Sequence, residues 1–458
     1  MRSAYVATAI ALAVCAGAAL ETIRSRAEDG DRSALLRQAI DDAPARNVLL
    51  FIGDGMGDSE ITAARNYEVG AAGRLAMDAL PLTGAYTTYS VHEMNPDLPD
   101  YVTDSAASGT GWATGHKTSN GRISTTAQTD RDLKTILEIA RERNMRTGNV
   151  TTAELTDATP AVLAAHVANR SCQGPADMAA CPQDRKNAGG KGSIAEQMLA
   201  HDIDVLMGGG AARFDQQMME DGRSPVQEAL ARGYQVIGGA AGLPLATPGR
   251  KLLGLFTPGN MTTEWSGLEA LPYPSNVARP QVCREDHRPG GEPSLAEMTA
   301  KAIELLDRPS GQGFFLQVEG ASIDKEDHNA NPCGQIGETV AFDRAIKIGM
   351  DFARAHRDTL LIVTADHGHT SQIVSMPTDL DHPTGVMSVL MTHDQAPMTI
   401  AYGTNAYHRF MDHTGTQVRI GAMGPQAANV VGITDQTDLF RLMLRAIDGR
   451  PEPESSTR

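Results

Sequence analysis

Positive charge is scarce in this sequence of 458 residues. Lysine and arginine together number 40, against 56 aspartates and glutamates, and the formal net charge is −16. This balance argues against nucleic acid or an anionic membrane surface as a partner, because both carry negative charge themselves. The sequence also lacks internal repeats and low-complexity tracts. Its length fits one large domain with surface insertions.

The beginning of the chain has the composition of a secretory signal peptide. Residues 1–18 combine a positive start, a short apolar core and an A-x-A cleavage site at 16–18, so the mature chain is expected to begin near Ala19. The apolar run is short for a membrane span of about 20 residues, which disfavours an anchor. Lipidation at Cys15 is disfavoured too, because Val14 is bulky where that signal has a small residue. We expect an exported protein, periplasmic or secreted, with no membrane anchor in its mature form.

Cysteine is rare: the chain has five, and one of them lies in the expected leader. The remaining four form an even number, which in an exported chain favours disulfides over free thiols or a zinc knuckle. Four cysteines allow three pairings. Cys172 and Cys181 bracket a short loop with a glycine and a proline, so their pairing is easy and leaves Cys283 for Cys333.

Continuous apolar runs alternate with helical patterns along the chain. Runs without strict alternation are typical of strands buried on both faces, as in parallel sheets. The sequence therefore predicts an α/β fold of three layers, α/β/α, with a large, mostly parallel central sheet and surface insertions. The runs lie at 47–52, 314–318 and 359–363, and the helical patterns at 133–143, 193–200 and 295–306.

One large domain is expected over residues 47–449, preceded by an N-terminal segment at 19–46. Within the domain, residues 208–290 are rich in glycine and proline with weak periodicity, which predicts loops and insertions that cover the sheet. Residues 450–458 hold prolines, glutamates and serines with no apolar side chain to anchor them, which predicts a disordered tail.

Carboxylates and histidines recur where the predicted strands end. Ligands of open α/β sheets bind beyond the carboxyl ends of the strands, so these side chains are expected to meet in one place. The four-residue spacing of Asp324 and His328 lets both face one metal ion from a helix or tight turn. The recurring residues are Asp54, Glu319, Asp324 with His328, Asp366 with His367, and His413.

Ser105 lies among small residues after a short β-prone run at 101–103. No histidine or lysine stands near it in the sequence to act as its base. A serine nucleophile without a local base needs another activator, and metal coordination is one. Together with the recurring carboxylates and histidines, Ser105 indicates metal-assisted phosphoryl transfer through serine.

Seven short motifs then occur in a fixed order. They are GDGMG at 53–57, TDSAA at 103–107, DATP at 157–160, VEG at 318–320, DKEDH at 324–328, TADH at 364–367 and HTG at 413–415. In this order they resemble the bacterial periplasmic alkaline phosphatases of the enteric type, which would make 47–449 the catalytic domain. Any one motif is weak evidence alone, whereas the set covers nearly all of the mature chain.

The resemblance implies a site with two zinc ions and one magnesium ion per subunit. One zinc would be held by Asp324, His328 and His413, and the second by Asp54, Asp366, His367 and the Ser105 oxygen. Asp54 would bridge to the magnesium ion, which Thr159, Glu319 and water complete. Mixed nitrogen and oxygen ligands suit zinc, and an all-oxygen shell suits magnesium.

The resemblance also assigns residues around the metals. Arg170, on a helix predicted to start at Pro160, would grip two phosphate oxygens with its guanidinium fork. Asp157 and Lys325 would form a pair linked through water to magnesium and phosphate. His369 would orient a ligand carboxylate.

The function implied by the resemblance is hydrolysis of a broad range of small phosphate monoesters through a phosphoserine. Inorganic phosphate would be released and would inhibit as product. The four ligand carboxylates and Arg170 sum to −3, and three divalent ions would bring the site to +3, so a phosphate dianion would be attracted only to the metal-loaded site. A homodimer is implied by the family alone.

The sequence disfavours three other functions. Sulfatases carry a Cys/Ser-x-Pro-x-Arg signature, and the residues after Ser105 lack both the proline and the arginine. Phosphodiesterases of the same superfamily lack the third metal site, for which Thr159 and Glu319 are present here. An exported zinc-binding protein without catalysis would need neither Ser105 nor Arg170.

Overall fold

The structure is a computed structural model, and it describes residues 31–448 except 220, 276, 278, 286–288, 309–310 and 406–409. The signal peptide expected at 1–18 and the tail expected at 450–458 lie outside the described residues, as does the first part of the segment 19–46. The described part of that segment contains helix α2 (Ser33–Ala39).

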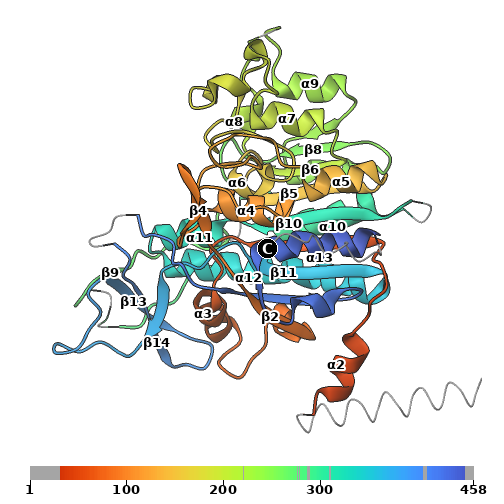
Figure 1. The fold of residues 1–458 in the computed structure, drawn as a ribbon. Coiled ribbons are helices and arrows are strands. Elements are labelled where there is room, and N and C mark those ends of the chain that lie inside the picture. Colours follow the sequence, from red (N-terminus) through yellow and green to blue (C-terminus); the bar gives the residue numbers. More distant parts are fainter. Residues whose placement is uncertain are drawn as a thin grey trace, which may run out of the picture.

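A ten-stranded sheet forms the centre of the molecule, in the order β16-β2-β15-β11-β1-β10-β5-β6-β8-β7 (Figure 1). All neighbouring strands are parallel except β15, which is antiparallel to both of its neighbours. The mostly parallel sheet predicted from the apolar runs is confirmed. The strands are β1 (Asn47–Gly53), β2 (Leu82–Thr87), β5 (Arg146–Glu154), β6 (Val205–Gly209), β7 (Gln235–Ile237), β8 (Leu252–Leu255), β10 (Phe314–Gly320), β11 (Thr359–Ala365), β15 (Val418–Met423) and β16 (Gly432–Asp435).

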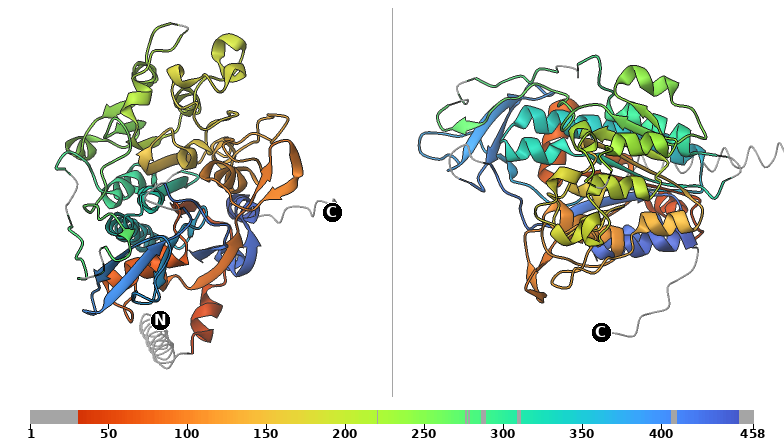
Figure 2. Two further views of the ribbon diagram at one scale, coloured as in Figure 1. Left: turned by 90° about the vertical axis from the view of Figure 1, so that its left-hand side faces the viewer. Right: turned by 90° about the horizontal axis from the view of Figure 1, so that it is seen from above.

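Helices cover both faces of this sheet, and Figure 2 shows α10 and α12 on the side opposite α13. One face carries α10 (Leu295–Leu306) and α12 (Pro332–Ala355), with α3 (Asp58–Glu68) and α11 (Ser322–His328) packed on α12. The other face carries α4 (Ser105–Thr114), α5 (Ile136–Glu142), α6 (Ala158–Ala161) and α13 (Gln436–Asp448). The three predicted layers are therefore present. No helix among the described residues is both long and apolar enough to span a bilayer.

The three predicted helical patterns are α5, α7 (Ile194–Ala200) and α10. Each begins after a residue whose hydroxyl accepts a hydrogen bond from the third helical N–H, at Thr135, Ser193 and Ser294. The carboxylate of a glutamate at that third position accepts a hydrogen bond from the backbone N–H of the cap residue. The capping box thus sets where these helices start.

The prediction of loops for residues 208–290 is wrong in part. The segment contains β7 and β8, which extend the central sheet, as well as the helices α8 (Ala211–Phe214) and α9 (Pro225–Ala231). These elements are too short for a periodic pattern to emerge from the sequence, and β8 is buried by pairing with β6 and β7.

A second, four-stranded antiparallel sheet was not predicted from the sequence. Its order is β12 (Ser371–Val374), β14 (Pro397–Tyr402), β13 (Val386–Met391) and β9 (Leu271–Pro272). It packs in a separate small core that also contains the disulfide Cys283–Cys333. The other disulfide joins Cys172 to Cys181, so the structure has both pairs expected from the sequence. A small hairpin of β3 (Ser90–His92) and β4 (Asn95–Asp100) completes the strands of the described residues.

Candidate active site

The carboxyl ends of three adjacent central strands bring the predicted ligands together. In the register of the sheet, Gly53 of β1 lies beside Gly320 of β10 and Ala365 of β11. Asp54 and Asp366 follow these strands directly, and the backbone N–H of Asp54 donates to the Gly320 carbonyl at 3.1 Å. Because parallel strands end at one edge, residues more than 300 positions apart become neighbours.

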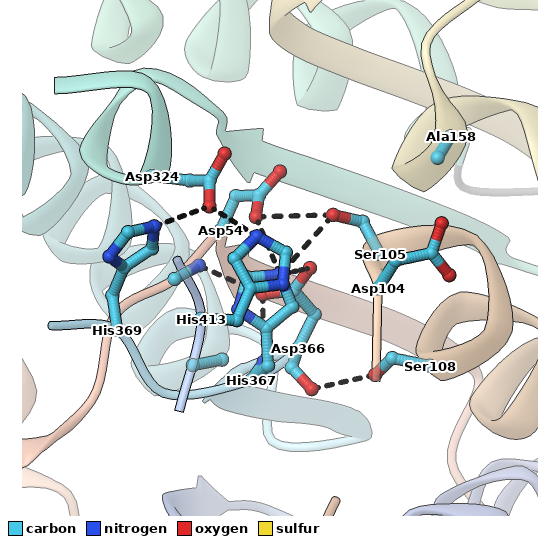
Figure 3. A network of polar contacts seen from close by, with 12 residues as sticks. Asp54, Asp104, Ser105, Ser108, Ala158, Asp324, Asp366, His367, His369 and His413 are labelled. Carbon is cyan, nitrogen blue, oxygen red and sulfur yellow. Dashed lines mark hydrogen bonds and ion pairs between the residues drawn. The ribbon is translucent and has the colours of Figure 1, made fainter. Parts of the chain in front are cut away.

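One group of side chains gathers around a single oxygen of Asp324. Asp324 Oδ1 lies 3.3 Å from His328 Nε2, 3.2 Å from His413 Nε2 and 3.3 Å from His369 Nε2. The four ligand atoms are all within 4.8 Å of one another. The predicted spacing of Asp324 and His328 is realised on helix α11, and His369 contacts the carboxylate that it was expected to orient (Figure 3).

The hydrogen bonds of two histidines show that this group favours a cation. His328 Nδ1 bonds the Met411 carbonyl, and His413 Nδ1 bonds the Thr103 carbonyl at 3.0 Å. In neutral rings this leaves both Nε2 atoms with lone pairs, yet they lie 3.1 Å apart. Burial lowers the pKa of His328 to about 4. Burial also lowers the pKa of His413, but Asp324 outweighs it and raises that pKa to about 9. A cation, either a proton or a metal ion, is needed between these atoms.

A second group surrounds the hydroxyl of Ser105. Ser105 Oγ lies 3.4 Å from Asp54 Oδ1 and 3.3 Å from His367 Nε2. His367 Nε2 is also 3.4 Å from Asp54 Oδ1 and 3.2 Å from Asp366 Oδ2, while burial lowers the pKa of His367 far below its usual value. Figure 3 shows these side chains converging. The groups that could bind a metal ion here are one neutral imidazole, two carboxylates and one hydroxyl.

Ser105 is the first residue of helix α4, and the Asp104 side chain caps that helix by accepting from the Ala107 N–H at 2.9 Å. One turn later, Ser108 Oγ donates to the Asp366 carbonyl at 2.6 Å, which ties α4 to the end of β11. The β-prone run before Ser105 is not a strand. Strand β4 ends at Asp100, residues 101–103 form no strand, and Tyr101 is 73% exposed.

A third set of oxygens comes from Thr159 and Glu319, and Glu319 lies beside Ile52 in the sheet register, two residues before Asp54. Thr159 Oγ1 is buried and makes no hydrogen bond to any described residue. Glu319 is buried and accepts a hydrogen bond from Thr151. Burial, reinforced by the carboxylate of Asp324, raises the pKa of Asp54 to about 7, and burial reinforced by Asp54 raises that of Glu319 to about 8. Buried carboxylates and a buried, unsatisfied hydroxyl are oxygen ligands of the kind that suit a hard cation such as magnesium.

Arg170 lies at the edge of this site in a chain of alternating charges. Its Nη1 donates to Asp104 at 3.2 Å and its Nη2 to Asp157 at 2.8 Å, and Lys325 Nζ donates to Asp157 at 3.0 Å. These pairings hold the guanidinium in place while its side chain remains 32% exposed. Asp157 and Lys325 cancel in charge, so the excess of negative charge at the ligands remains.

The helix predicted from Pro160 to Arg170 is wrong in its bounds. Helix α6 begins at Ala158, where the Asp157 side chain accepts the Ala158 N–H at 2.8 Å, and it ends at Ala161. Val167 then forms a β-bridge with Ile123, which pulls the chain out of helical geometry. Arg170 follows in a loop that reaches the site.

Most of these groups open into one pocket of about 750 Å³. Phe410 lies at its rim, 62% exposed, with its ring stacked on His328 at a centroid distance of 3.7 Å. No sequence motif pointed to Phe410, because only its tertiary contact with His328 places it at the site. The site residues among the pocket lining are Ser105, Asp157, Arg170, Asp324, Lys325, His328 and His413.

Comparison with known proteins agrees with this geometry. The family model for alkaline phosphatase matches residues 45–411. The chain is 52% identical to streptomycin-6-phosphate phosphatase of Streptomyces griseus, over 88% of this chain and 91% of that protein. It is 51% identical to alkaline phosphatase of Escherichia coli (strain K12), over 91% of this chain and 89% of that protein.

Solved structures share the fold. The alkaline phosphatase of the Antarctic bacterium TAB5 superposes with a TM-score of 0.68 at 24% identity, covering 89% of this chain and 99% of that one. The Thermus thermophilus alkaline phosphatase gives 0.67 at 23% identity, covering 90% and 94%. Taken with the sequence identities and the metal-ligand clusters at the strand ends, these similarities show that the chain belongs to the alkaline phosphatase family.

Proposed function

We propose that this chain hydrolyses phosphate monoesters through a covalent phosphoserine on Ser105. The observation that carries the proposal is the position of Ser105 Oγ, within 3.4 Å of Asp54 and His367 and open to the pocket that Arg170 lines. A nucleophile, a cation-binding cluster and an anion-binding arginine thus meet at one place.

The donor sets support two zinc ions and one magnesium ion. The clusters around Asp324 and around Asp366 combine imidazole nitrogen with carboxylate oxygen, which suits zinc. The set of Asp54, Thr159 and Glu319 offers oxygen alone, which suits magnesium. Bound divalent ions supply Lewis acidity, which favours the ionised serine and stabilises negative charge as it develops on oxygen.

The protein side chains position the reaction. Ser105 Oγ loses its proton and attacks phosphorus, so that an O–P bond to serine forms as the ester O–P bond breaks and the alcohol leaves with a proton. Water then attacks the phosphoserine from the opposite side, which frees Ser105 and releases inorganic phosphate. Through both steps, Arg170 can hold two non-bridging oxygens, because Asp104 and Asp157 fix its guanidinium plane.

Ser105, Arg170 and the metal-binding side chains would act on the phosphoryl group alone, which supports a broad range of leaving groups. The pocket is also lined by Glu154, Phe410 and Asp412, which are available to contact a leaving group. The similar identities to streptomycin-6-phosphate phosphatase and to the Escherichia coli alkaline phosphatase do not select one substrate. A phosphorylated aminoglycoside therefore belongs in the substrate panel.

Export to the periplasm, cleavage of a leader at residues 1–18 and a homodimeric state are part of this proposal. The two disulfides support an oxidising compartment. The dimer rests on the family resemblance, and sedimentation of the mature protein would test it.

The deciding experiment compares three chromogenic substrates on the purified, metal-loaded protein: a phosphate monoester, a phosphate diester and a sulfate ester. The proposal predicts rapid turnover of the monoester and far slower turnover of the others. A preference for the diester or the sulfate ester would replace it with another member of the superfamily, and no turnover of any ester would favour a non-catalytic metal-binding protein.

A further inference from the structure

A further cluster of metal-binding side chains lies away from the pocket. Within the described ranges, Glu138, His166 and His201 bring ligand atoms within 4.8 Å of one another, and none of the three lines the phosphate pocket. Glu138 belongs to α5, His166 to the loop after α6, and His201 caps the end of α7. Three separate segments therefore converge on one point.

A single oxygen of Glu138 is the centre of this cluster. Glu138 Oε1 lies 3.3 Å from His166 Nε2 and 3.7 Å from His201 Nε2. The other oxygen, Oε2, accepts the Thr135 N–H at 2.8 Å as part of the helix cap. The cap thus fixes the carboxylate and leaves Oε1 directed at the two imidazoles.

His166 is held just as firmly. Only 3% of its surface is exposed, and its Nδ1 lies 3.0 Å from the Ser124 carbonyl oxygen. Its backbone N–H and C=O both bond the Gln197 side chain, at 2.9 and 3.1 Å, which joins this loop to α7. A neutral ring that donates from Nδ1 presents a lone pair at Nε2, aimed at a carboxylate oxygen. Such a contact needs a positive charge between the two atoms.

His201 distinguishes a metal site from a simple ion pair. A protonated His166 could satisfy Glu138 alone, and a second imidazole would then be superfluous. His201 Nε2 faces the same Glu138 oxygen at 3.7 Å, and its ring centroid lies 6.2 Å from that of His166, so two imidazoles converge on one oxygen. A neutral imidazole is the form that binds metal ions.

We propose that Glu138, His166 and His201 bind a divalent transition-metal ion, of which zinc is the expected physiological one. Two imidazoles and one carboxylate form a known zinc donor set, and a water molecule would complete the coordination. The His201 side chain is 21% exposed, which gives the ion a route from solvent. The hydrogen bonds of His166 Nδ1 to the Ser124 carbonyl and of the Thr135 N–H to Glu138 Oε2 are of the kind that orient metal ligands.

The site would act on stability rather than on catalysis. It joins α5, which packs on β5, to α7 and to the loop that follows α6. An ion that binds the folded state alone stabilises it by mass action, and at about a hundred times its Kd the expected rise in Tm is about 3–5 °C for a chain of this size. The turnover rate of the phosphatase reaction should not change.

Anomalous diffraction at the zinc edge gives the direct test. Crystals of the full mature chain are soaked with zinc chloride, as wild type, as His201→Ala, and as the control His356→Ala. His356 also faces one carboxylate, with Nε2 4.0 Å from Asp307 Oδ2, but it belongs to no three-residue cluster among the described residues. His201 is chosen over the buried His166 because its removal should leave the fold intact.

We expect a peak between Glu138, His166 and His201 in the wild type and in the control, and none there in His201→Ala. Peaks in the catalytic pocket serve as an internal standard in all three crystals. Pocket peaks without a peak at the cluster would overturn the proposal, and the absence of both would contradict the metal dependence of the pocket as well. In solution, zinc added to protein with saturated pocket sites should raise Tm in the wild type and not in His201→Ala; equal shifts would also overturn the proposal.

Discussion

Removal of the Arg170 guanidinium should weaken phosphate binding without ending catalysis. In Arg170→Ala the metal ions keep most of the positive charge, and the loss is a bidentate grip on two phosphoryl oxygens. A charge-assisted hydrogen bond contributes about 1.5–3 kcal/mol, and each ~1.4 kcal/mol is a factor of ten in rate or affinity. The expected loss in kcat/KM is therefore about tenfold to a hundredfold.

The contacts of Arg170 indicate that this variant will fold. Asp157 keeps the hydrogen bond from Lys325 Nζ at 3.0 Å, and Asp104 keeps two backbone N–H donors at 2.9 and 3.0 Å. Neither carboxylate is left buried without a partner, so the stability loss should be small. A changed activity can then be assigned to the site rather than to unfolding.

The assay measures kcat/KM for a chromogenic monoester and the inhibition constant of inorganic phosphate, at equal metal content. Arg170→Lys serves as the matched control, because it keeps the charge and loses the planar fork, and it should recover only part of the loss. Unchanged constants in Arg170→Ala would refute the placement of this side chain on the phosphate.

A chelator should abolish activity and lower Tm, because the metal-free site is left with uncompensated carboxylates, and zinc with magnesium should restore both. Full activity in protein that elemental analysis shows to be metal-free would contradict this prediction. Replacing Cys283 and Cys333 by alanine should lower the free energy of unfolding more than replacing Cys172 and Cys181. The sequence separations are 50 and 9, for which the chain-entropy model gives losses of about 4 and about 2.5 kcal/mol. Denaturant unfolding measures both losses, and the reverse order would contradict this prediction. Phe410→Ala should raise the KM for aryl monoesters about two- to tenfold, because an aromatic contact with the leaving group is lost. The KM for alkyl monoesters and the inhibition constant of phosphate should stay unchanged. An equal rise in KM for both ester classes would show that Phe410 does not bind the leaving group.

The sequence predicted those parts of the fold that local patterns encode. The central strands β1, β10 and β11 are seven residues each and buried throughout, so their apolar runs are unmistakable. By contrast, β7 and β8 owe their existence to neighbours in the sheet, and a run of three or four residues carries no period. The antiparallel sheet depends on pairing between segments as distant as β9 and β13, which no local pattern reports.

In the candidate site, too, the sequence predicted the residue types but not the tertiary contacts. Carboxylates and histidines at strand ends were identified from their residue types, and the sheet register brings them together. The Asp104–Arg170–Asp157 arrangement and the stack of Phe410 on His328 are tertiary contacts, and the sequence gives no sign of either. The bounds of α6 were missed because the Asp157 cap competes with the proline signal, and the bridge at Val167 ends the helix.

The central claim is that phosphate passes through Ser105, and acid quenching of the metal-loaded enzyme with radiolabelled phosphate tests it most directly. Wild type should yield a single labelled peptide that contains Ser105. Ser105→Ala, in which one oxygen is lost from a site held by many other ligands, should keep the fold, bind phosphate and yield no labelled peptide. Label on any other residue, or label retained in Ser105→Ala, would contradict the account.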